Sequence, residues 1–143
     1  MSKIKLKYDA TLCVSVLLLI LIMTMPTFSQ TKASHEANVV VKILESSYRF
    51  KKLTEGLEER IKKNGGKTYG IMFTGSPNPK KDSANAISKN YEINLHESYD
   101  DRMVVIARFL FDPAKQKLFE VDSEDGLDAI SFDRKLLPLF NNK

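Results

Sequence analysis

The stretch RFLFDPAKQKLFEVD, from Arg108 to Asp122, decides the expected fold class. Apolar and polar residues alternate on both sides of Asp112-Pro113, and a period of two is typical of a half-buried β-strand. Proline presets φ for the second position of a tight turn, so Asp-Pro marks the point where the chain reverses. The stretch therefore predicts a β-hairpin.

The strand that enters this hairpin, residues 103–111, is apolar on both faces except for Arg108, which predicts a central strand. Successive residues of a strand point to opposite faces of the sheet. We expect the set of alternate residues that contains no charged side chain to face the core: Met103, Val105, Ala107, Phe109 and Phe111. Arg108 is then expected to face solvent.

Two earlier segments alternate with the same period. Residues 67–73 place Tyr69, Ile71 and Phe73 on one face, and residues 89–97 do the same with Tyr91, Ile93 and Leu95. Residues 75–88 contain two prolines and are predicted as a loop. Together with 103–111 and 117–122, these segments predict four antiparallel strands.

A helix is expected to precede the sheet. Ser34 can cap it, and Asn64-Gly65-Gly66 can end it. Two apolar stripes with helical spacing run along residues 37–48 and 50–61 but do not join, so either the helix is kinked near Ser46-Ser47 or its first part is something else. Residues 39–43 are β-branched enough for a strand. We favour helix, because residues 45–63 have an uninterrupted helical pattern, and we expect a short closing helix over 130–140.

The expected fold class is thus α+β, with the N-terminal helix packed on one face of a four-stranded antiparallel sheet. A helix followed by an antiparallel meander resembles the cystatin-like fold. Residues YEINL (91–95), RFLFDP (108–113) and LFEV (118–121) resemble the closing strands of PepSY-type domains, although Ala114-Lys115-Gln116 stands where those domains often have Thr-Gly. The resemblance implies a binding or inhibitory module and carries over no catalytic residue.

The N-terminus has the features of a secretory signal. Lysines at positions 3, 5 and 7 precede an apolar run over 10–25, and the small residues Thr27 and Ser29 follow it. We predict a signal peptide over 1–29 and a single domain over 30–143, in a secreted or periplasmic protein. An uncleaved signal anchor is the alternative, because the run is only slightly shorter than the roughly 20 residues of a spanning helix.

Cys13 is the sole cysteine and lies at the front of the apolar run, so neither a lipoprotein nor a disulfide is expected. Charge divides the rest of the chain: residues 31–81 hold 11 Lys and Arg against five acids, and residues 82–143 hold eight against 12. The basic residues share a predicted helix with glutamates, which indicates a solvated helix face. We therefore expect no nucleic-acid partner, and a membrane contact only through an uncleaved signal.

Two clusters of the sequence contain residue types that could form chemical sites. The acidic loop 122–128 contains glycine and carboxylates, but its spacing fails the helix–loop–helix calcium register, so no metal or other cofactor is predicted. His96 is followed by Glu97, Ser98, Asp100 and Asp101, yet adjacent strand residues point to opposite faces. We expect a surface histidine and no catalytic residue.

The expected function is a non-enzymatic binding module for a protein or peptide, which includes the possibility of an inhibitor of a hydrolase. The alternative is a small hydrolase or metal-dependent enzyme that uses His96 and the nearby acids. Loops as long as 74–88 are usually functional or disordered. The predicted contact residues are in this loop, on the neighbouring strand and in the hairpin turn: Asn78, Lys80, Lys81, His96 and Lys115.

Overall fold

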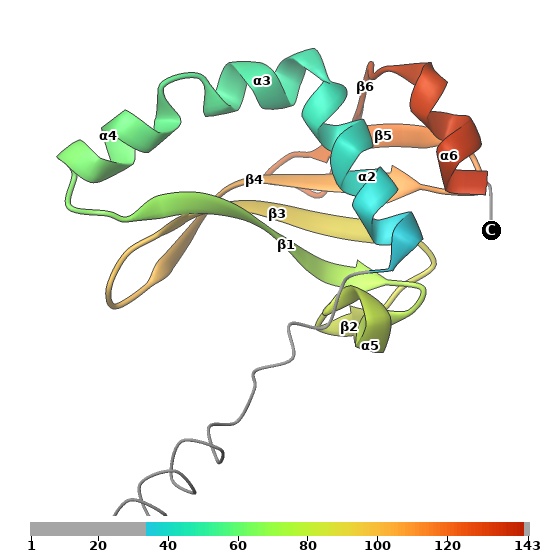
Figure 1. Cartoon of the computed structure of the whole chain (residues 1–143), viewed down its shortest axis with the longest axis horizontal. Coiled ribbons are helices and arrows are strands. Elements are labelled where there is room, and N and C mark those ends of the chain that lie inside the picture. The colour runs from blue at the N-terminus through green and yellow to red at the C-terminus, as the bar shows by residue number, and fades with distance from the viewer. Residues whose placement is uncertain (1–33, 142–143) are drawn as a thin grey trace, which may run out of the picture. The chain divides into compact units, whose positions relative to one another are not determined.

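Three consecutive helices, α2 (His35–Ser46), α3 (Tyr48–Thr54) and α4 (Leu57–Lys63), begin the part of the chain that the computed structural model describes, residues 34–141. They follow one another in an arc over one face of a sheet (Figure 1). The Ser34 hydroxyl caps α2 by accepting a hydrogen bond from the N–H of Ala37 at 3.1 Å. The predicted cap is confirmed, and residues 39–43 are helical.

The arc has two breaks. Ser47 is extended, with ψ 142°, and its hydroxyl caps α3 by accepting from the N–H of Phe50 at 3.2 Å. This confirms the predicted kink. Gly56 lies at φ +63°, a left-handed conformation that favours glycine, and it separates α3 from α4. The uninterrupted helix expected over 45–63 is therefore wrong, because a serine cap and a glycine each end one helix and start another.

The sheet has six strands in the order β2-β1-β3-β4-β5-β6. Their bounds are β1 (Thr68–Ser76), β2 (Ala86–Ile87), β3 (Tyr91–Ser98), β4 (Met103–Asp112), β5 (Lys117–Val121) and β6 (Leu127–Ile130). Neighbours are antiparallel except β1 and β2, which pair in parallel at Gly75↔Ala86 and Ser76↔Ile87. The α+β class is confirmed, and the four-stranded antiparallel sheet is corrected to a mixed one of six.

The missed elements are short. Helix α5 (Pro79–Asp82) and β2 lie inside the segment expected to be a loop, and β6 follows the acidic loop. Elements of two to four residues carry too little periodicity to be recognised in sequence. The closing helix expected over 130–140 is instead a 3-10 turn, η1 (Arg134–Leu136), followed by α6 (Leu137–Asn141), since residue 130 still belongs to the sheet.

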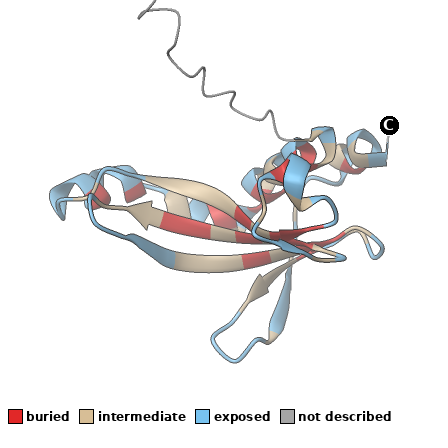
Figure 2. Ribbon diagram, turned by 90° about the horizontal axis from the view of Figure 1, so that it is seen from below, coloured by how far each residue is buried: buried red, intermediate tan, exposed pale blue. Residues whose placement is uncertain are grey.

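The core lies between the helices and one face of the sheet, and Figure 2 shows buried residues concentrated in one part of the strands. Helix α2 contributes Val40, Ile43 and Leu44, which are fully buried. The sheet contributes alternate residues of its central strands, as the period predicts: Ile93, Leu95, Phe109, Phe111 and Leu118. An ion pair between Arg49 of α3 and Glu120 of β5, with N–O distances of 2.7 and 2.8 Å, joins the two layers.

A β-bulge alters the predicted parity of β4. Leu95 pairs with Ala107, but the next residue of β3, His96, pairs with Val105, so Ile106 is an extra residue. One extra residue moves every side chain beyond it to the other face. Phe109 and Phe111 face the core as predicted, whereas Met103 and Val105, expected to face the core with them, are 59% and 47% exposed.

The compact unit Thr31–Lys143 contains this whole core. The predicted signal peptide over 1–29 lies outside the described residues. Among the helices of residues 34–141, none is long and apolar enough to cross a membrane.

Candidate binding sites

The first half of β4 has one strand neighbour where its second half has two. Strand β3 pairs with β4 along its length, but β5 begins to pair only at Arg108↔Val121. Within residues 34–141, no strand pairs with the outer side of residues 103–107. Along the free side of an edge strand, alternate residues present unpaired backbone N–H and C=O groups that can pair with another chain.

The first three side chains of this free edge are apolar and exposed. Met103 is 59% exposed, Val104 38% and Val105 47%, and successive residues cover both faces of the strand. The outer edge of β1 differs, because its residues 69–72 are half-buried whereas residues 103–105 of β4 are exposed. Met103–Ala107 is therefore the edge more open to another strand, and we call it the β4 edge.

An acidic loop lies at the inner end of the β4 edge. The guanidinium of Arg108 donates to Asp125 Oδ1 at 2.9 Å and to the carbonyl oxygen of Asp122. Asp122 Oδ1 accepts from the backbone N–H groups of Glu124 and Gly126 at 2.8 and 2.7 Å. Two of the carboxylates of the acidic loop, those of Asp122 and Asp125, thus stabilise the loop itself, and Glu124 is exposed.

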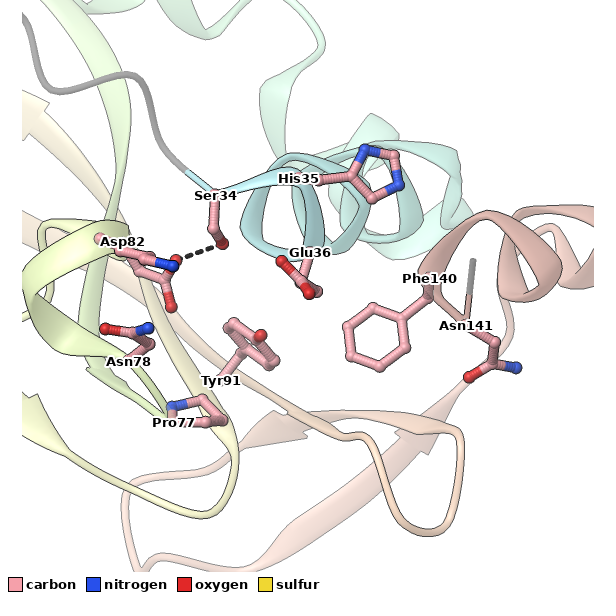
Figure 3. A pocket seen from close by; sticks show the side chains of 10 residues that line it. Ser34, His35, Glu36, Pro77, Asn78, Asp82, Tyr91, Phe140 and Asn141 are labelled. Atoms are coloured by element: carbon pink, nitrogen blue, oxygen red, sulfur yellow. Dashed lines mark hydrogen bonds between the residues drawn. The ribbon is translucent and has the colours of Figure 1, made fainter. Parts of the chain in front are cut away.

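A pocket of about 970 Å³ opens where the start of α2 meets α5, β3 and α6 (Figure 3). Asp82, at the end of α5, is 2% exposed. Its Oδ1 accepts a hydrogen bond from the hydroxyl of Ser34, whereas its Oδ2 is buried and has no hydrogen-bond partner in the described part of the chain. Glu36 of α2 also lines the pocket.

Two aromatic side chains, those of Tyr91 and Phe140, line this pocket. Tyr91 and Phe140 meet edge to face, with ring centroids 6.0 Å apart. Desolvation, together with the negative charges of Asp82 and Glu36, raises the pKa of Tyr91 to about 12. The carboxylates of Asp82 and Glu36 and the two rings therefore line the same pocket.

His96 is on the face of β3 that carries Val105, and its ring lies over Gly70. A Cβ atom at Gly70 would come within 3.0 Å of this ring, so glycine leaves room for the imidazole. His96 is only 9% exposed and its Nδ1 has no partner in residues 34–141. The surface histidine expected from sequence is wrong, because Gly70 allows the ring to lie flat against the sheet.

The five predicted contact residues do not form one surface. Asn78 and Lys81 line the pocket, and Lys80 is exposed on α5 beside them. Lys115 lies in the β4–β5 turn, where its ammonium is 3.3 Å from Asp112 Oδ2. His96 lies elsewhere on β3.

Of the pocket residues, the sequence indicated Asn78 and Lys81 as contacts and Ser34 as a helix cap, but it did not indicate Asp82, Glu36 or Phe140 as site residues. Asp82 follows two exposed lysines in what looked like a loop, and no periodicity indicates that it is buried. Groups of three or more side chains suited to a metal are absent from residues 34–141.

Comparison of the chain with models of protein families, with curated proteins and with solved structures finds no match. The resemblance to cystatin-like and PepSY-type domains therefore stays a prediction.

Proposed function

We propose that this chain is an exported, non-enzymatic binding module that recognises an extended peptide segment by pairing it with the β4 edge. The single observation that carries the proposal is the register of the sheet: β5 leaves the outer side of residues 103–107 unpaired, and the apolar side chains of Met103, Val104 and Val105 are exposed there. Addition of a strand to an exposed edge is a recurrent mode of peptide recognition, in which main-chain hydrogen bonds supply affinity.

The side chains beside the edge favour a particular kind of segment. Apolar groups on both faces of β4 favour β-branched or apolar residues in the segment, because cross-strand pairs of such residues stabilise a sheet. Glu124 is exposed beside the inner end of the edge, and Asp100 and Asp101 lie before its outer end. These acids favour a basic residue at the ends of the segment.

The acids at the outer end are partly neutralised. Asp100 forms an ion pair with Lys67, and Asp101 pairs with Arg102 at 3.2 Å. Glu124 has no ion pair in residues 34–141. A basic residue is therefore expected mainly opposite the 122–126 loop.

The test selects displayed short peptides on residues 31–143 and compares the selected peptides on two variants. Val105→Lys places a charge on the β4 edge, a substitution that natural edges use against pairing. Leu139→Lys is the matched control, because Leu139 is an exposed apolar residue of α6. We expect Val105→Lys to weaken binding by about tenfold or more, or ~1.4 kcal/mol, and Leu139→Lys to leave it unchanged.

Amide hydrogen exchange supplies the second measurement. A peptide that adds a strand should slow exchange at amides within residues 103–107, because new main-chain hydrogen bonds form there. Selected peptides that bind Val105→Lys as tightly as the parent chain, or that protect another segment, would show the proposal to be wrong.

A further inference from the structure

The carboxylate of Asp82 has one hydrogen bond fewer than its burial requires. The residue is 2% exposed, and only Oδ1 has a partner, the hydroxyl of Ser34. That hydroxyl carries a single proton, which it donates to Oδ1, so it has none to offer Oδ2. A buried charged acceptor without a donor is costly and rare in folded proteins, and it often marks a place for a missing partner.

The surroundings indicate what the missing partner is. Oδ2 needs a donor, and a second carboxylate, that of Glu36, lines the same pocket, so a positively charged donor is favoured. The rings of Tyr91 and Phe140 offer apolar and π surfaces that suit an alkyl chain bearing a cation. Figure 3 shows Asp82, Glu36, Tyr91 and Phe140 around one opening.

We propose that the pocket between α2, α5, β3 and α6 binds an organic primary ammonium group, with the ammonium donating to Asp82 and its alkyl chain against Tyr91 and Phe140. Two carboxylates are fewer than the six or more oxygens that calcium takes, and residues 34–141 hold no group of three metal-binding side chains. An amine needs fewer acceptors. This site is separate from the β4 edge and does not rest on the function proposed for it.

A Lys81 variant can test whether the pocket binds a cation or an anion. It is exposed, lines the pocket and has no ion pair in the described residues. Its charge competes with an ammonium ligand, so Lys81→Ala should strengthen binding of an amine. An anion held by Lys81 would show the opposite dependence, since its binding would weaken in Lys81→Ala and strengthen in Asp82→Asn.

The experiment titrates butylammonium chloride into residues 31–143 and follows the NMR signals of Tyr91 and Phe140. Butanol lacks the charge, and tetramethylammonium lacks an N–H donor. We expect butylammonium to shift both signals and the two control compounds to shift them much less. Asp82→Asn should weaken butylammonium binding by about tenfold or more, because it removes a charge-assisted hydrogen bond.

Asp82→Asn keeps an oxygen that can accept from Ser34, so the fold is expected to persist, and a thermal melt checks this. Asp128→Asn is the matched control, because Asp128 is exposed on β6 and does not line the pocket. Equal binding by the parent chain and Asp82→Asn, or equal shifts from butanol and butylammonium, would overturn the proposal.

A second arm identifies the source of the ammonium. The same titration is repeated with a short blocked peptide that contains one lysine, and with the same peptide acetylated on that lysine. Binding of the unmodified peptide above butylammonium supports a lysine side chain as the ligand, and the reverse order supports a free amine. Binding of the acetylated peptide as tightly as the unmodified one would count against an ammonium site.

Discussion

The two halves of β4 have similar apolar sequences but different environments. Residues 109–112 lie between β3 and β5 and under the helices, and Phe109 and Phe111 are 1% and 0% exposed. Residues 103–107 have a strand neighbour on one side, and their first three residues are exposed. Apolar composition alone therefore does not decide burial, because burial depends on how far the neighbouring strand extends.

The bulge strengthens this contrast. It changes the face on which Val105 lies, so the exposed half does not continue the core-facing row of the buried half. Exposed apolar edges promote aggregation, and proteins limit that risk with charges beside them. Arg102 and Arg108 flank the β4 edge in this way.

The largest expected loss of stability comes from truncating a side chain in the buried half of β4. Phe109→Ala removes a ring that packs against Phe50, at a centroid distance of 6.4 Å, and should lower the free energy of unfolding by about 3–5 kcal/mol. Val105→Ala, in the exposed half, should lower it by less than about 1 kcal/mol. Urea unfolding of both variants measures the difference. Equal losses would mean that the two halves are buried alike.

A middle-sized effect is expected at Asp112, which ends the buried half. Its Oδ1 accepts from the N–H groups of Ala114 and Lys115, each at 3.0 Å, and so holds the β4–β5 turn. Asp112→Ala should lower the free energy of unfolding by about 1–2 kcal/mol, measured by urea unfolding at neutral pH. Pro113→Ala, in the same turn, is the control that leaves these hydrogen bonds in place.

The same variant has a pH signature. The hydrogen bond from the Lys115 N–H lowers the pKa of Asp112 against desolvation, with help from the Lys115 ammonium and the Ala114 N–H. A lowered folded-state pKa stabilises the fold above the unfolded-state value and ceases to do so as pH falls through the folded value. The difference in free energy of unfolding between the parent chain and Asp112→Ala should therefore become smaller in acid. A difference that widens there would contradict the assignment.

The smallest effect is expected at the boundary between the halves. Arg108 pairs with Asp125, and both side chains are largely open to water, so Arg108→Ala should lower the free energy of unfolding by about 0–1 kcal/mol. Hydrogen exchange in the 122–126 loop should nevertheless quicken, since Arg108 also donates to the carbonyl of Asp122. Arg102→Ala is the control. A loss as large as that of Phe109→Ala would place Arg108 in the core.

Elements with a strong local signal could be predicted from the sequence alone. Ser34 and Ser47 cap helices because their hydroxyls can accept from N–H groups a few residues ahead, and Gly65 ends α4 at φ +79°. The alternation around Asp112-Pro113 fixed the hairpin and placed Phe109 and Phe111 in the core. These features depend on residues close together in the chain.

Only the tertiary structure decided the rest. The extra residue at Ile106 and the point where β5 begins to pair depend on two strands at once, so the exposure of the β4 edge has no local signal. The Asp82 pocket unites α2, α5, β3 and α6, whose residues lie far apart in sequence. Periodicity reports which residues of one element share a face, and it carries no information about what another element places against that face.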